Sequence, residues 1–104
     1  MIRQFDVFPN PLKSGRRERP FVVSLQHYSL NHYPTRLVAP LAIDGAVVPM
    51  GRMTPLFDIA GQKLRLSPTE IATLAIRYLK APIANLESQR DKIIAALDLV
   101  FTGI

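Results

Sequence analysis

The two histidines, His27 and His32, are the residues whose types best suit acid–base chemistry. Cleavage of RNA needs a base, an acid and a cation for the charged phosphorane, and Arg36 lies near enough in the sequence to be that cation. The histidines stand five residues apart around an expected turn, without a carboxylate cluster, which makes them a poor metal site. We favour structural or solvent-exposed roles for both, and an ordinary surface role for Arg36.

Known catalytic motifs are missing from the sequence. It contains no phosphate-binding glycine loop, no H-E-x-x-H and no nucleophile elbow. It also contains no cysteine, which excludes disulfides and cysteine-ligated metals and fits a reducing compartment. We therefore expect no catalytic residue, no metal and no cofactor, and we interpret the chain as a binding protein.

Basic residues outnumber acidic ones by 13 to 8, which gives a net charge of +5. The clearest cluster is Arg16, Arg17 and Arg19, interrupted by Glu18. No aromatic side chains are interleaved with it, although single-strand binders need them to stack on bases. We rank a solvated loop first, a contact for an acidic protein second and a nucleic-acid site third.

The length of 104 residues predicts one domain spanning 1–104. The N-terminal segment meets Asp6 and Pro9 before any apolar run develops, so we expect no signal peptide. No stretch approaches the roughly 20 apolar residues that span a bilayer. We expect a cytoplasmic protein without membrane contact.

Nine prolines punctuate the chain as far as Pro82, which favours short strands followed by one long element. Apolar and β-branched runs predict strands at 3–8, 21–28 and 35–41, with Pro40 marking an edge strand or a strand end. A loop or small hairpin is expected at 42–53. The strongest hairpin signal joins 56–59 to 63–66, with Gly61 in the turn.

Local rules predict a helix at 68–80. Ser67 and Glu70 have the spacing of a capping box, and Pro68 suits a first helical turn. The apolar residues of this segment do not alternate strictly, so periodicity does not decide between helix and strand.

A second helix is expected at 85–101, with Asn85 as N-cap and Gly103 as terminator. Large apolar residues recur there at helical spacing: Leu86, Ile93, Ile94, Leu97, Val100 and Phe101. We expect Leu97, Val100 and Phe101 to lie in the core. Ile104 follows the terminator, and we expect it at the surface.

Three segments taken together, PTRLVAPLA, PLFDIAGQ and ALDLVFTGI, resemble the CcdB toxins of plasmid and chromosomal toxin–antitoxin modules. The start RQFDVF is similar to the first strand of that family. The resemblance covers nearly the whole chain, and Thr54–Ile104 aligns with the best-known plasmid member without a gap.

The resemblance implies a mostly β (α+β) fold, an SH3-like antiparallel barrel or sheet over about 1–80 with one C-terminal helix, working as a homodimer. In the family the segment equivalent to 68–80 is extended, and we follow the family there against the local helix signal.

The resemblance also implies a function without catalysis. CcdB toxins bind the A subunit of DNA gyrase and trap the enzyme on cleaved DNA, and a CcdA-like antitoxin removes them. DNA is then met only through gyrase or the antitoxin. By resemblance the gyrase-binding residues are Thr102, Gly103, Ile104, Ser29, Leu30 and Asp98. Antitoxin-binding candidates are Arg16, Arg17, Arg19, Ile43 and Val47.

Two departures concern the gyrase contact. Thr102 stands where the plasmid toxin has tryptophan, and Ser29 and Leu30 stand where it has two isoleucines. Two alternatives stay open: an endoribonuclease toxin of the MazF type on a similar fold, which would use His27, His32 or Arg36, and a degenerate CcdB homologue that is not toxic.

Overall fold

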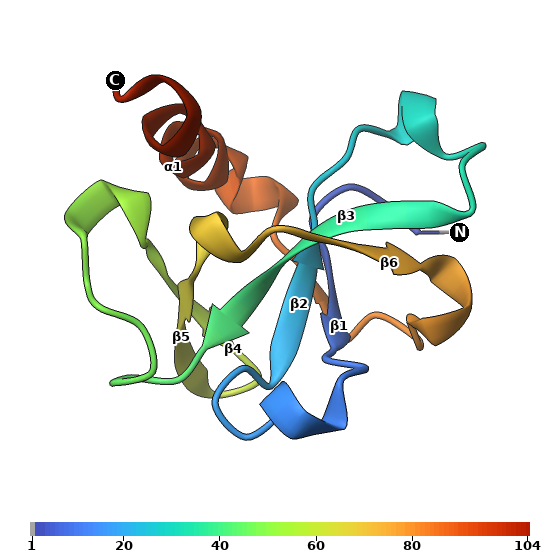
Figure 1. Ribbon diagram of the computed structural model, residues 1–104, viewed down its shortest axis with the longest axis horizontal. Coiled ribbons are helices and arrows are strands. Elements are labelled where there is room, and N and C mark those ends of the chain that lie inside the picture. The colour runs from blue at the N-terminus through green and yellow to red at the C-terminus, as the bar shows by residue number, and fades with distance from the viewer. Residues whose placement is uncertain (1) are drawn as a thin grey trace.

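The computed structural model describes residues 2–104. A curved, nearly closed antiparallel sheet carries one C-terminal helix, α1 (Arg90–Thr102) (Figure 1). The strands are β1 (Asp6–Pro9), β2 (Phe21–Ser24), β3 (Thr35–Ala42), β4 (Leu56–Ile59), β5 (Gln62–Leu66), β6 (Ala72–Ala75) and β7 (Ala84–Asn85). Their order is β4-β5-β3-β2-β1-β7, with β6 also paired to β3. The expected mostly β fold with a C-terminal helix is confirmed.

The central strand β3 has two partners on one side. Its first half pairs with β6 and its last two residues pair with β5. Pro40 lies in the gap between these partners. Its carbonyl accepts a hydrogen bond from the Ser67 N–H at 3.0 Å, an ordinary length for such a bond. Because neither β5 nor β6 pairs with Pro40, the N–H that proline lacks is not needed for a hydrogen bond between strands. The expectation that Pro40 marks an edge strand or a strand end was wrong.

The first two strands are shorter than expected. Phe5 has a φ of 67°, and Asp6 accepts a hydrogen bond from the Arg3 N–H at 2.8 Å, so 3–6 forms a turn before β1. Strand β2 stops at Ser24, and a 3₁₀ turn follows at Tyr28–Leu30. Side-chain to backbone bonds in both places replace the strand ladder.

The hairpin is confirmed, with β4 and β5 joined by the two-residue turn Ala60–Gly61. Both residues have positive φ, 52° and 78°, as a type I′ turn requires. The region 43–55 is a loop with one 3₁₀ turn at Gly51–Met53, as expected.

The segment 68–80 consists of the short strand β6 between two 3₁₀ turns and contains no α-helix, so the local helix signal was misleading. The Ser67 hydroxyl does donate to the Glu70 carboxylate, but only a single 3₁₀ turn, Pro68–Glu70, follows. Next comes β6, paired with Thr35–Val38, and then a 3₁₀ turn at Ile76–Tyr78. Pairing with β3 stabilises the extended form, and short-range rules do not register that contact.

Helix α1 begins five residues later than expected. Asn85 belongs to β7, where its amide donates to Asp6 at 2.9 Å and its side-chain oxygen accepts from the Glu87 N–H at 2.8 Å. A 3₁₀ turn, Glu87–Gln89, then leads into α1. At the other end, Gly103 caps the helix with a φ of 79°, as predicted.

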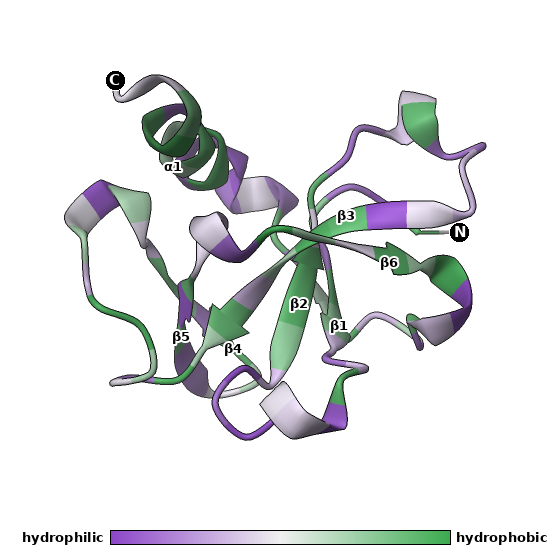
Figure 2. Ribbon diagram, in the orientation of Figure 1, coloured by the Kyte–Doolittle hydropathy of each residue, from purple (hydrophilic) through white to green (hydrophobic). Residues whose placement is uncertain are grey.

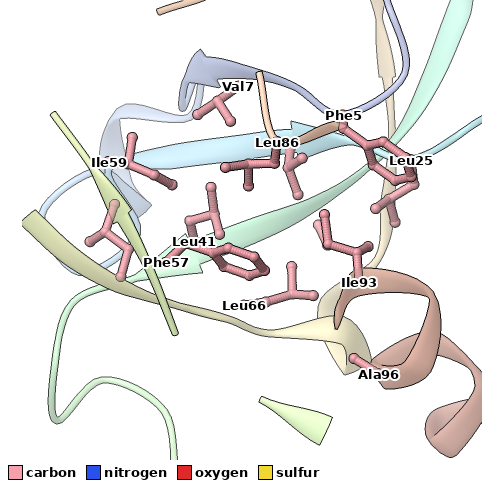
Figure 3. Packing of buried hydrophobic residues seen from close by; sticks show 13 residues of the cluster. Phe5, Val7, Leu25, Leu41, Phe57, Ile59, Leu66, Leu86, Ile93 and Ala96 are labelled. Atoms are coloured by element: carbon pink, nitrogen blue, oxygen red, sulfur yellow. The ribbon is translucent and has the colours of Figure 1, made fainter. Parts of the chain in front are cut away.

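The main core lies between the concave face of the sheet and α1 (Figure 3). Ile93 and Ala96 are the buried residues of α1, and they pack with Phe5, Leu25 and Leu66. A smaller cluster, Phe8, Val22, Val38 and Leu79 with Ile2 and Leu74, covers the opposite face of the sheet. The helix is therefore held at its first turns.

Phe101 is not in the core. Its side chain is 72 % exposed, and the last turns of α1 extend beyond the sheet (Figure 1). Colouring by hydropathy shows that these projecting turns are hydrophobic (Figure 2). The core placement of Phe101 was wrong because the helix leaves the sheet before its last turn, while Leu97 and Val100 are half-buried.

Candidate partner-binding surfaces

The end of α1 is a compact exposed tip made of Asp98, Phe101, Thr102, Gly103 and Ile104. The Thr102 hydroxyl donates to the Asp98 carbonyl at 2.7 Å, and the Ile104 N–H donates to the Thr102 oxygen at 3.4 Å. The left-handed Gly103 directs Ile104 into solvent, where it is 88 % exposed. Two large apolar side chains therefore stand unburied on a fixed backbone.

Ser29 and Leu30 lie on the 3₁₀ turn Tyr28–Leu30, which His27 opens by accepting a hydrogen bond from the Ser29 N–H at 3.2 Å. In Figure 1 this turn and the end of α1 occupy two separated corners of the molecule. A single chain therefore brings Asp98 and Thr102–Ile104 together but leaves Ser29 and Leu30 apart from them.

The three arginines of the basic loop are not equivalent. Arg16 donates through Nε to the Asn10 carbonyl at 2.9 Å, and Arg19 pairs with Glu70 at 2.8 Å. Within residues 2–104, Arg17 has no carboxylate partner and is exposed. The loop therefore presents one unengaged guanidinium, whereas the other two organise the loop itself.

The loop 43–50 lies against the basic loop, because the Ile43 N–H donates to the Glu18 carbonyl at 2.9 Å. Val47, Met50 and Arg19 line a hollow of about 270 Å³ between this loop and the turn Pro68–Glu70. The antitoxin-binding candidates are thus gathered on one side of the molecule, with Ile43 half-buried against the core.

Glu70 is the titratable group that this arrangement shifts. Burial alone raises its pKa, but hydrogen bonds from Arg19 and Ser67 and the charge of Arg19 outweigh burial and lower the pKa from its ordinary 4.5. Arg19 binds both carboxylate oxygens, through Nε at 2.8 Å and Nη2 at 3.0 Å. The pair fixes the turn Pro68–Glu70 to the basic loop.

The residues that acid–base chemistry would use are dispersed. His27 lines a cleft of about 470 Å³ together with Arg3 and Arg90, whereas His32 lies against the Tyr33 ring at 4.4 Å. Arg36 is not a surface arginine: it is 4 % exposed and lines a different hollow. The cation and the two histidines therefore do not meet at one site.

Sequence reasoning missed the exposure of Phe101 and the burial of Arg36. The sequence did carry a signal for Phe101. Phe101 follows the buried Ile93 by eight residues, and two helical side chains eight residues apart point in directions that differ by about 80° around the helix axis. Arg36 gave no local signal, because its burial depends on the loop 31–35 and on the segment 76–82.

In residues 2–104, no three histidine, aspartate or glutamate side chains gather closely enough to hold a metal ion. Among the same residues no helix combines the length and the apolar character needed to cross a membrane.

A family model described as CcdB protein matches residues 4–103 of the 104-residue chain. No curated protein matches the sequence. The matched range includes the sheet, both loops of the basic side and all but the last residue of the tip. With this match over almost its whole length, the chain belongs to the CcdB family, a family of toxins of toxin–antitoxin modules.

Proposed function

We propose that this chain is a cytoplasmic, non-catalytic toxin that binds the A subunit of DNA gyrase as a homodimer and traps the enzyme on cleaved DNA. The observation that carries the proposal is the exposed apolar tip of α1. Phe101 and Ile104 are 72 % and 88 % exposed, on a helix end held by a glycine cap. Large apolar side chains fixed in solvent are typical of a partner interface.

A two-fold dimer would join surfaces that one chain keeps apart. The turn Tyr28–Leu30, which carries Ser29 and Leu30, lies at a different corner from the end of α1. A second copy related by a two-fold axis would place its own tip and turn beside those of the first. Exposed Leu37 on β3 adds apolar area for such a contact. We infer that the surface of the toxin that binds gyrase is formed by both protomers.

The tip differs chemically from one that carries a tryptophan. The Thr102 hydroxyl is engaged with the Asp98 carbonyl, so it offers a partner mainly a methyl group. A tryptophan there would stack on an arginine, a contact of up to about 2 kcal/mol when desolvated. We therefore expect weaker gyrase binding than that of a tryptophan-bearing tip, with Phe101 supplying the aromatic area.

The opposite side of the molecule suits a CcdA-like antitoxin. Arg17 is unengaged, and the hollow beside Val47 and Met50 combines apolar walls with the Arg19–Glu70 pair. An antitoxin segment that carries both acidic and apolar residues would complement this surface. DNA would then be reached only through gyrase or the antitoxin.

An endoribonuclease of the MazF type is the second candidate, and only the cleft beside His27 favours it, because Arg3 and Arg90 stand there with a histidine. Against it, Arg36 and His32 lie elsewhere. Replacing His32 by alanine and His27 by asparagine, which can still accept the hydrogen bond from the Ser29 N–H, should therefore leave growth arrest intact if the toxin acts on gyrase.

The test of gyrase binding is deletion of Thr102–Ile104. We expect the deletion to abolish trapped cleavage complexes on supercoiled DNA, while the melting temperature changes little, because the tip contributes no core residue. Arg17→Ala serves as the control, since it removes an exposed residue from the other side. Undiminished trapping by the deletion variant would contradict the proposal, and failure of the parent to trap gyrase at all would favour the degenerate, non-toxic alternative.

A further inference from the structure

Arg36 is a buried cation without an anionic partner. It is 4 % exposed, and no ion pair in residues 2–104 includes it. Removing a charge from water is costly unless an opposite charge or a full set of hydrogen bonds compensates. Arg36 therefore needs its hydrogen bonds to be complete, or an anion nearby.

Its hydrogen bonds are incomplete. Nη1 donates to the carbonyls of Tyr33 and Thr35 at 2.8 and 2.9 Å, and Nη2 donates to the Asn31 carbonyl at 3.4 Å. Nε is buried and has no partner. Since a guanidinium has five N–H donors, the Nε proton and one Nη2 proton remain unused. Nε is enclosed by the protein, so Arg36 acts on its surroundings through its uncompensated charge and not through a bidentate contact.

Arg36 lines a hollow of about 690 Å³ between the segment 76–82 and the N-terminal part of the chain. Two further cations, Arg77 and Lys80, line the same hollow, and neither has a carboxylate partner among the described residues. No acidic residue lines it. Its remaining walls include the apolar side chains of Ile76, Leu79 and Pro82.

We propose that this hollow binds a carboxylate carried on an apolar body. Three cations around one hollow attract an anion, because no acidic residue of its lining compensates their charges. The hydrocarbon walls favour burial of an apolar chain over a strongly hydrated inorganic phosphate. The hollow is lined by neither the tip of α1 nor the basic loop, so the inference is independent of gyrase and antitoxin binding.

The test is a titration of the folded protein with hexanoate, followed by NMR at the Arg36 Nε–H and at the backbone amides of Ile76 and Leu79. Acetate lacks the apolar chain, 1-hexanol lacks the charge, and inorganic phosphate lacks both the chain and the planar carboxylate. We expect hexanoate to bind at least about tenfold more tightly than any of these, since it alone uses both the cations and the apolar walls.

The variant Arg77→Ala/Lys80→Ala should weaken hexanoate binding about tenfold without unfolding the protein, because both side chains are exposed. The control Arg17→Ala/Lys63→Ala removes the same net charge at positions away from the hollow, and it should leave the affinity for hexanoate unchanged. Arg36→Met, which removes the buried charge but keeps a long side chain, should weaken binding further if its melting temperature shows that it folds.

Three outcomes would overturn the proposal: equal affinity for hexanoate and 1-hexanol, an affinity unchanged in the double variant, or equal weakening in the control. A capped Leu-Glu-Leu tripeptide, whose only carboxylate is its glutamate side chain, distinguishes the sources. Tighter binding than hexanoate assigns the site to an acidic peptide segment, and weaker binding assigns it to a small organic acid.

Discussion

At the scale of the residue, Thr102 limits the hydrogen-bonding capacity of the α1 tip. Its hydroxyl bonds to the Asp98 carbonyl at 2.7 Å and so turns inward to its own helix. The aromatic residue beside it, Phe101, is the exposed one. The tip therefore offers a partner aliphatic and aromatic carbon, with little hydrogen-bonding capacity of its own.

Thr102→Trp is expected to tighten gyrase binding. If the tip contacts an arginine of gyrase, the added stacking would strengthen binding about tenfold for each ~1.4 kcal/mol gained. Titration of trapped cleavage complexes against toxin concentration measures the change. Thr102→Val, which keeps the size but removes the hydroxyl, is the control. A tryptophan variant no better than the valine variant would show that position 102 does not face gyrase.

Glu70 makes the stability depend on pH. Because folding lowers its pKa, the pair with Arg19 stabilises the protein above pH 4.5 and ceases to do so as the pH falls through the lowered pKa. Glu70→Gln should therefore lower the free energy of unfolding at pH 7 by no more than about 1 kcal/mol, since the pair is partly exposed.

Urea unfolding at pH 7 and at a series of pH values below 4.5 measures this difference, which should shrink as the pH falls and vanish once Glu70 is protonated in the folded protein. Glu18→Gln is the matched control, because Glu18 lies 3.9 Å from the same arginine but is more exposed. A loss of stability that stays the same over the whole acidic series would contradict the role assigned to the Glu70 charge.

At the scale of the element, α1 has two parts with different functions. Its first turns are buried through Ile93 and Ala96, and Lys92 ties them to the sheet by donating to the Leu56 carbonyl at 2.7 Å. Its last turn has no such contacts and is exposed. The helix thus acts as a support, anchored at one end, that holds the tip in solvent.

This division predicts that two alanine substitutions in α1 lower the free energy of unfolding by unequal amounts. Ile93→Ala should lower the free energy of unfolding by about 2–5 kcal/mol, because it leaves a cavity in the core. Phe101→Ala should cost less than about 1 kcal/mol within one protomer, because little of its surface is buried. Urea unfolding at several protein concentrations measures both. A large loss for Phe101→Ala that does not vary with concentration would place this residue in the core after all.

Elements fixed by local chemistry could be predicted from the sequence. Gly61 and Gly103 mark the hairpin turn and the helix end through their positive φ, and both predictions are confirmed. The segment 68–80 could not be settled in this way, because β6 depends on pairing with β3 more than thirty residues away. Only the resemblance of the whole chain to a family supplied that long-range information.

The binding surfaces were less predictable than the fold. The sequence located the tip, but not the exposure of Phe101, since that depends on where α1 leaves the sheet. It also presented Arg16, Arg17 and Arg19 as one cluster, whereas Asn10 and Glu70 engage two of the three. The Arg19–Glu70 pair joins residues 51 positions apart, and the Arg16–Asn10 bond, although it spans six residues, follows no sequence periodicity.

At the scale of the whole molecule, the proposed gyrase surface would have to combine two separated corners. The tip of α1 and the turn Tyr28–Leu30 are both exposed and both partly apolar, yet one chain holds them apart (Figure 1). One tip alone offers two large apolar side chains, much less than the roughly 800 Å² per partner of a standard interface. A homodimer doubles the number of tips and turns and lets them form one surface.

We therefore expect a homodimer in solution. Light scattering coupled to gel filtration at micromolar concentration should give about twice the protomer mass of 11.6 kDa. Phe101→Asp should shift the protein toward the monomer if the tip lies at the two-fold axis, because burying an unpaired carboxylate in an apolar contact is costly. Val48→Asp, at a similarly exposed apolar residue on the antitoxin-binding side, is the control and should leave the mass unchanged. A parent protein that elutes as a monomer at every concentration would remove the composite surface, and with it the reason for two chains to act on gyrase together.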